Sequence, residues 1–236
     1  MQSFGEIFDR AAARKGGAAA LEGLIAEWPA KGHAELVATP DDRWLAEITR
    51  SVFQAGFNWR VIDNKWPGFE EAFHGFDPKL NAAMSEEEFD AHLKDTRIIR
   101  NGAKIAAVRA NAQFLVDLAK EHGSAARFFA GWPDSDLVGL LDLMKKRAAR
   151  CAGETAMRLL RRMGKPAFIT TRDVAAALVE AGVLSAPPKN RKDLQAVQVA
   201  FNAWSQATGR DFNAISRTLA LSTGPSYEPG APPWPR

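Results

Sequence analysis

Apolar side chains recur along this chain at intervals of three and four residues. The longest such stripe lies within residues 101–122, and a clear shorter one comprises Trp44, Ile48, Val52 and Ala55. This spacing gathers apolar side chains on one face of a helix, whereas a half-buried strand would alternate apolar and polar residues. No segment shows a convincing alternation. The pattern therefore predicts an all-α protein.

Residues with strong capping or breaking preferences predict where these helices begin and end. Residues 39–42 read Thr-Pro-Asp-Asp, which combines a capping hydroxyl, a proline for the first turn and two acids that favour a helix N-terminus. Pro67-Gly68 predicts a break in the helix that begins after Asn58, and Pro187-Pro188 predicts another break. The helices between these signals are short and numerous.

The domain organisation follows from the distribution of these segments. Residues 1–223 are predicted to form a single helical domain, to which residues 1–40 and 187–223 add helices whose lobe the sequence leaves open. Residues 224–236 contain five of the thirteen prolines and are predicted to be disordered.

Composition limits the classes of function. The chain has 236 residues and a net charge of only +3, so a nucleic-acid partner is not indicated by overall basicity. The single cysteine, Cys151, excludes an internal disulfide and a multi-cysteine zinc site, and the four histidines are scattered. We therefore expect no metal and no cofactor. No run reaches the length of a membrane span and the N-terminus lacks a leader pattern, so we expect a cytoplasmic protein with no membrane partner.

The strongest local excess of positive charge lies in residues 145–165, which contain eight lysine and arginine residues and a single acid, Glu154. A small-residue turn separates two helix-like runs in this segment. Backbone N–H groups at such a turn, and at the start of the helix that follows it, can bind a phosphate, and cations add attraction. The alternative is a solvated basic helix pair without a ligand. The residues predicted to bind DNA are Arg147, Arg150, Ala152, Gly153, Thr155 and Lys165.

The hairpin segment resembles the helix-hairpin-helix DNA glycosylases. The resemblance is carried by Gly-Glu-Thr-Ala at 153–156, Gly-Lys-Pro-Ala-Phe at 164–168 and Asp173, which falls where that superfamily has a catalytic aspartate. The usual hairpin has two glycines, whereas here Ala152 stands near one of them and one residue is missing before Thr155. The resemblance implies two helical lobes with a cleft between them.

A second resemblance is to the DNA-3-methyladenine glycosylase I (Tag) family. Residues 54–59 read Gln-Ala-Gly-Phe-Asn-Trp, residues 73–78 read Phe-His-Gly-Phe-Asp-Pro and residues 98–105 read Ile-Ile-Arg-Asn-Gly-Ala-Lys-Ile. All three are similar to hallmarks of that family, in the same order, and Asn111 matches a further one. The chain departs from the family in lacking its cysteine and histidine zinc ligands, and in carrying Ser51 where the family has a base-reading glutamate.

The resemblance implies a DNA glycosylase that hydrolyses the N-glycosidic bond of an alkylated, 3-methyladenine-like base flipped out of duplex DNA. Trp59 would stack on that base, with Ser51 and Phe57 beside it in the base pocket. The alternatives are that Trp59 is a core residue and that Ser51 bonds a backbone carbonyl. Glu47, one turn before Ser51, could replace the missing carboxylate if it points inward, but a solvated position is the expectation.

Asp173 is the predicted catalytic residue, because an ionised carboxylate stabilises the oxocarbenium character of the sugar and orients the attacking water. Its alternative role is to cap the helix that follows. No lysine stands at the superfamily's Schiff-base position, so a monofunctional enzyme is expected. The expected oligomeric state is a monomer. The competing hypotheses are a helix-hairpin-helix DNA-binding protein that is inactive or altered in specificity, and a structural or protein-interaction role.

Overall fold

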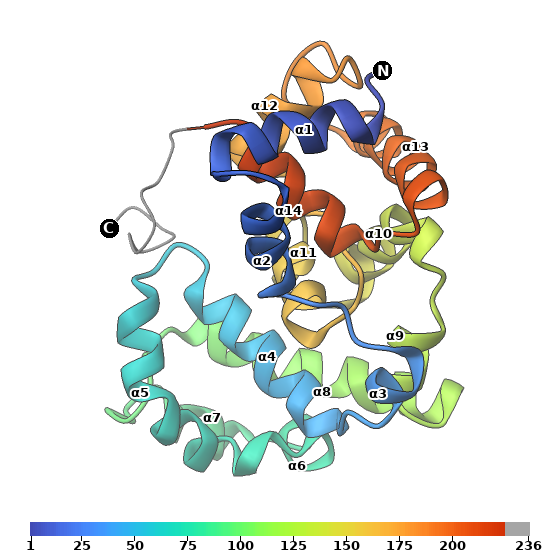
Figure 1. The fold of residues 1–236 in the computed structure, drawn as a ribbon. Coiled ribbons are helices and arrows are strands. Elements are labelled where there is room, and N and C mark those ends of the chain that lie inside the picture. Colours follow the sequence, from blue (N-terminus) through green and yellow to red (C-terminus); the bar gives the residue numbers. More distant parts are fainter. Residues whose placement is uncertain (225–236) are drawn as a thin grey trace. The chain divides into compact units, whose positions relative to one another are not determined.

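The computed structural model describes residues 1–224, and within this range it contains α helices and two short 3-10 helices but no strand (Figure 1). This confirms the predicted all-α fold. The predicted disordered tail, residues 224–236, lies outside the described residues except for Gly224. Contacts divide the chain into two compact units, Lys31–Pro166 and a second formed by Met1–Ala30 together with Ala167–Arg236.

The unit of residues 31–166 contains the segments that carry most of the sequence motifs. Its helices are α3 (His33–Val37), α4 (Asp41–Gln54), α5 (Trp59–Ala72), η1 (His74–Phe76), α6 (Pro78–Ala82), α7 (Glu86–His92), α8 (Gly102–His122), α9 (Ala125–Gly131), η2 (Asp134–Asp136), α10 (Leu137–Arg147) and α11 (Glu154–Met163).

The core of this unit is built around α4. The indole of Trp44 is fully buried and stacks on Phe129 of α9, with ring centroids 4.2 Å apart. The carboxylate of Asp41, at the start of α4, accepts hydrogen bonds of 3.0 Å from the backbone N–H groups of Ala125 and Ala126. This acid therefore neutralises the start of α9 as well as favouring the start of its own helix.

The other unit joins the two ends of the chain. It contains α1 (Phe4–Lys15), α2 (Ala18–Ala26), α12 (Arg172–Glu180), α13 (Arg191–Thr208) and α14 (Phe212–Ser222). Helix α14 lies against α1 and α12, and the rings of Phe168, Phe201 and Phe212 form its aromatic centre.

The sequence left open the lobe to which residues 1–40 and 187–223 belong. Residues 1–30 join the C-terminal helices, whereas α3 belongs to the unit of residues 31–166. The single domain over residues 1–223, and the cleft that the resemblance implies, stay predictions.

One predicted helix boundary is wrong. Helix α5 continues through Pro67-Gly68 to Ala72. Proline removes one backbone donor within the helix, but the apolar face of α5 keeps the segment helical, since Ile62, Phe69 and Ala72 are all buried. Gly68 is required here because the backbone of Arg97 lies against it: a Cβ atom at Gly68 would be 2.7 Å from the Arg97 carbonyl oxygen.

Two glycine substitutions test this packing. We expect Gly68→Ala to destabilise the protein by about 1–3 kcal/mol, because backbone must move to make room. Gly23→Ala is the matched control, since Gly23 is exposed in α2 and a Cβ atom there would meet no neighbouring segment within 4 Å. It should stabilise by about 0.5–1 kcal/mol. Urea denaturation measures both, and equal effects of the two substitutions would contradict the close approach of Arg97.

Candidate functional site

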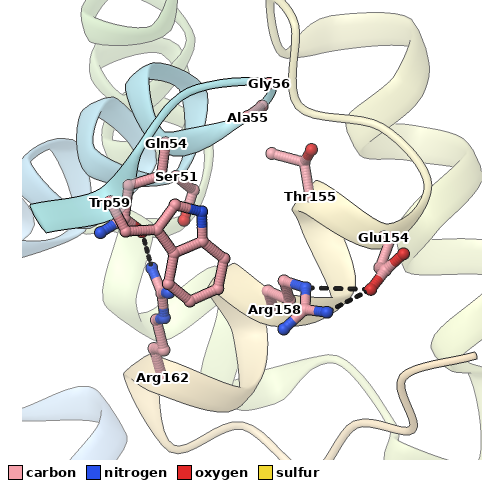
Figure 2. A pocket seen from close by; sticks show the side chains of 9 residues that line it. All are labelled: Ser51, Gln54, Ala55, Gly56, Trp59, Glu154, Thr155, Arg158 and Arg162. Atoms are coloured by element: carbon pink, nitrogen blue, oxygen red, sulfur yellow. Dashed lines mark hydrogen bonds and ion pairs between the residues drawn. The ribbon is translucent and has the colours of Figure 1, made fainter. Parts of the chain in front are cut away.

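A pocket of about 290 Å³ opens between two segments of the unit formed by residues 31–166 (Figure 2). One wall comes from the end of α4 and the start of α5, and the other wall comes from the first three turns of α11. The residues that line it are Ser51, Gln54, Ala55, Gly56, Trp59, Glu154, Thr155, Arg158 and Arg162.

The first wall is held by a lysine from α8. The Nζ atom of Lys104 donates hydrogen bonds to the carbonyl oxygens of Phe53 and Ala55, at 3.0 and 2.9 Å. These carbonyls belong to the C-terminal end of α4, where a cation is favourable. Burial, together with the charge of Arg150, lowers the pKa of Lys104. The chain then turns at Gly56, which has a φ of 68°, and Trp59 follows as the first residue of α5.

The second wall begins at the hairpin between α10 and α11. Arg150 and Gly153 adopt φ values of 56° and 55°, so the turn bends sharply at both positions. Gly153 precedes α11 and no side chain caps that helix. The first backbone N–H groups of α11 are therefore free of a side-chain cap, and such groups attract anions.

Asn111 of α8 holds this hairpin through its backbone. Its Nδ2 atom donates to the carbonyl oxygen of Ala149 at 3.0 Å, and its Oδ1 atom accepts from the Ala149 N–H at 2.7 Å. The Asn111 side chain is buried. The pair of bonds fixes the hairpin to the same helix that carries Lys104.

Trp59 is the aromatic wall of the pocket and is 37% exposed. Two guanidinium groups lie over its ring, with their central carbons 5.5 Å (Arg158) and 5.0 Å (Arg162) from the ring centroid. Figure 2 shows both arginines on α11 beside the indole, with Arg158 joined to the Glu154 carboxylate. Trp59 and Ser51 both line this pocket, as predicted. The alternative, in which Trp59 is a core residue, does not agree with its exposure.

Glu47 points inward, which corrects the expectation of a solvated residue. Its carboxylate accepts from the Ser51 hydroxyl at 3.3 Å and from Nη1 of Arg162 at 2.9 Å. The same Nη1 atom also donates to Oε1 of Gln54 at 2.8 Å. The Ser51 hydroxyl therefore bonds a carboxylate rather than the backbone carbonyl that was the alternative. The cause is Arg162, whose cation draws Glu47 into a half-buried position.

Two residues predicted for the site lie elsewhere. Lys165 is 2% exposed, and its ammonium group donates to the carboxylate of Asp134 at 2.6 Å and to the carbonyl oxygen of Trp132. A buried, paired lysine cannot meet a phosphate. Phe57 does not line the pocket but is 44% exposed beside Lys104, whose Nζ atom is 5.7 Å from the ring centroid. Both residues are placed by partners that are distant in sequence, Asp134 for Lys165 and Lys104 for Phe57.

The remaining predicted DNA-binding residues stay on or near the hairpin. Arg150, Ala152 and Gly153 are exposed, and Thr155 lines the pocket. Arg147 is exposed but pairs with both oxygens of Glu121, at 3.1 and 2.8 Å. That pairing raises the pKa of Arg147, and the carboxylate of Glu121 offsets the charge of the guanidinium.

Asp173 lies in the other unit, at the second residue of α12. The cap of that helix is Thr171, whose hydroxyl accepts from the N–H of Val174. The alternative role of Asp173 as the cap is therefore wrong. Its carbonyl oxygen accepts from the Thr223 hydroxyl at 2.8 Å, and a Cβ atom at Gly224 would come within 2.8 Å of its carboxylate.

The prediction overlooked four polar residues of the pocket. Gln54, Glu154, Arg158 and Arg162 all line it. The last three are spaced four residues apart on α11, which places them on one helical face. That spacing, in the segment already singled out for its charge, is the signal that could have identified them.

Three further observations limit the chemistry. Cys151 is fully buried, and burial raises the pKa of its thiol to about 12, so it is not a thiolate nucleophile at neutral pH. Within residues 1–224, no three histidine, cysteine, aspartate or glutamate side chains are grouped to bind a metal ion. None of the helices in that range is long and apolar enough to cross a membrane.

Comparison with known proteins places these features in a family. The sequence model of the methyladenine glycosylase family matches residues 36–181. A DNA-3-methyladenine glycosylase of Haemophilus influenzae is 37% identical over 67 residues, which are 28% of this chain and 36% of that protein. DNA-3-methyladenine glycosylase 1 of Escherichia coli K12 is 40% identical over 60 residues, which are 25% of this chain and 32% of that protein.

These matches are partial. The aligned segments span about a third of the length of the two curated relatives. A crystal structure of 3-methyladenine DNA glycosylase I superimposes with a TM-score of 0.46 at 27% identity, covering 53% of this chain and 80% of that one.

The clamp between Asn111 and the hairpin gives a test of the second wall. Asn111→Ala leaves both backbone groups of Ala149 without their partner, so we expect a loss of about 1–3 kcal/mol in the free energy of unfolding. The Ala149 amide should also exchange with deuterium much faster. Gln113→Ala is the control on the same helix, because Gln113 is exposed and, among residues 1–224, its side chain bonds Asp117 alone. Unchanged exchange at Ala149 in Asn111→Ala would contradict the clamp.

Proposed function

Because the chain belongs to the methyladenine glycosylase family, we propose that it is a DNA glycosylase. It hydrolyses the N-glycosidic bond of an alkylated, 3-methyladenine-like base that has been flipped out of duplex DNA. The observation that carries this proposal is the tryptophan-walled pocket next to the uncapped N-terminus of a hairpin helix. A glycosylase needs these two features side by side. The pocket holds the flipped base, and the helix N-terminus binds the phosphate backbone of the same DNA strand.

Trp59 is the proposed stacking surface for the flipped base. A base presents a π-face, and stacking on an aromatic ring contributes about 1–3 kcal/mol per base on single strands. The pocket volume of about 290 Å³ is at the small end of ligand sites, which suits one base. Because the Trp59 ring is partly exposed in the free protein, a base can reach it without unfolding a helix.

The hairpin is the proposed DNA contact. Exposed backbone at Ala152 and Gly153 and the first N–H groups of α11 offer hydrogen bonds to a phosphate, and Arg150 adds a cation on the same turn. Arg147 contributes less than its charge suggests, since Glu121 already holds it. The proposed partner is therefore double-stranded DNA, bound through the hairpin backbone rather than through a broad basic surface.

Asp173 is the proposed catalytic group. As the bond between C1′ and the base nitrogen breaks, the base leaves with the bonding electrons and the sugar gains positive charge. An ionised carboxylate stabilises that charge, orients the water whose oxygen forms the new bond to C1′ and accepts the proton that this water loses. Since Thr171 caps α12, the Asp173 carboxylate does not serve as the cap of that helix.

The enzyme is proposed to be monofunctional. A lyase would need a lysine amine to attack C1′, and Lys165, which follows the hairpin helix, is buried against Asp134. We further propose that the protein acts as a monomer in the cytoplasm, without metal or cofactor. The second candidate function, a hairpin protein of altered specificity, is favoured by Ser51, which stands where the resemblance to the Tag family implies a glutamate.

Single-turnover base release tests the proposal on duplexes that carry either a cationic or a neutral lesion. Asp173→Asn should lower the rate on a stable, neutral lesion by about a hundredfold or more, and less on a cationic purine, which departs more easily. Trp59→Ala should weaken capture of either base by roughly 1–3 kcal/mol.

The controls are Asp9→Asn, an exposed acid, and Trp28→Ala, a tryptophan that is 55% exposed and does not line the pocket. Both should behave like the unaltered protein. If Asp173→Asn and Trp59→Ala also match it on both lesions, these two residues do not perform the proposed roles.

A further inference from the structure

We propose that Arg162 makes this pocket selective for alkylated guanines that keep O6 and N7 free, such as guanine methylated at N3, over 3-methyladenine. This inference rests on the proposed function and names the base within it. It follows from the donors and acceptors that the pocket presents. Arg162 lines the pocket, and its side chain is 24% exposed.

Arg162 is fixed in one orientation by two partners. Its Nη1 atom donates to Glu47 at 2.9 Å and to Gln54 at 2.8 Å. Within residues 1–224, no hydrogen bond engages its Nη2 or Nε atom. The guanidinium thus has one edge anchored to the protein and further N–H donors available to a ligand, and its central carbon is 5.0 Å from the centroid of the Trp59 ring.

The carboxylates and the side-chain amide oxygen around the pocket each accept from an arginine. The Glu47 carboxylate accepts from Arg162 and Ser51, and the Glu154 carboxylate accepts from Arg158. The side-chain oxygen of Gln54 accepts from Arg162, and its nitrogen donates to Asp63 at 3.3 Å. No carboxylate that lacks a cationic partner therefore lies at this wall of the described pocket.

This inventory discriminates between the two methylated purines. The exocyclic group of adenine is an amine, which donates, and it would meet the N–H groups of Arg162. The exocyclic O6 of guanine accepts, and O6 with N7 is the pair of acceptors that a guanidinium binds through two parallel bonds. Both bases are cationic while attached to DNA, so their charge does not distinguish them. The donors and acceptors on their hydrogen-bonding edges do distinguish them.

Glu47 is a positioning residue in this proposal. It does not line the pocket, but it holds the guanidinium whose free donors do. Ser51 takes part by bonding the same carboxylate oxygen. A glutamate at position 51 would add an acceptor at this wall, so the serine removes a group that would favour an amine.

The test uses duplex DNA treated with dimethyl sulfate, which carries 3-methyladenine, 3-methylguanine and 7-methylguanine on one substrate. Released bases are separated and each rate is divided by the amount of that base present. The unaltered protein should release 3-methylguanine faster than 3-methyladenine, and faster than 7-methylguanine, whose N7 is blocked. Arg162→Gln should lower the ratio of 3-methylguanine to 3-methyladenine by about tenfold or more.

Arg161→Gln is the matched control, because it removes the same charge from the same helix at a residue that does not line the pocket. It should leave the ratio unchanged. Glu47→Gln should lower the ratio while retaining the Arg162 charge. The ratio comes from a single sample, so partial unfolding of a variant does not alter it. Preferred release of 3-methyladenine by the unaltered protein, or equal ratios in Arg162→Gln and Arg161→Gln, overturns the inference.

Binding of the free bases separates this inference from the proposed function. If no base is released, tryptophan fluorescence is titrated with free 3-methylguanine and free 3-methyladenine. Tighter binding of the guanine, lost in Arg162→Gln, supports the inference while the glycosylase proposal fails. Equal binding of the two bases overturns the inference on its own.

Discussion

Helix α8 holds both walls of the pocket through two side chains that lie seven residues apart. Lys104 binds the carbonyl oxygens at the end of α4, and Asn111 binds both backbone groups of Ala149 in the hairpin. Seven residues are two helical turns, so both side chains leave α8 on the same face. The pocket therefore depends on one helix, α8. This explains why the chain carries the family motifs that contain Lys104 and Asn111, although neither residue lines the pocket.

The charges of the pocket are arranged in pairs that set its character. Glu47 holds Arg162 and Glu154 holds Arg158, while both guanidinium groups remain close to Trp59. Half-buried pairs of this kind contribute little to stability by themselves, since desolvation offsets their attraction. Their effect is on geometry: they hold the two guanidinium groups over the ring of Trp59. Under the proposal made above, such a pocket distinguishes bases by their hydrogen-bonding edges.

Local patterns predicted the helices and part of the site. Periodicity and caps indicated the all-α fold. The resemblance suggested that Ser51 and Trp59 share a pocket, and both line it. Thr155, which was predicted to bind DNA, lines the same pocket. Two of the failures share one cause. Lys165 is buried by Asp134, thirty-one positions away, and Glu47 is drawn inward by Arg162, 115 positions away. No pattern within a helix reports such partners, because they are chosen by tertiary packing.

The central claim is that a flipped base stacks on Trp59 while the hairpin binds its strand. The most direct measurement is a crystal structure of the protein with free 3-methylguanine and a duplex that carries a stable abasic-site analogue. The account predicts the purine ring against Trp59 with O6 facing Arg162, and a DNA phosphate at the first N–H groups of α11. A base bound elsewhere, or a duplex that does not touch the hairpin, would contradict it.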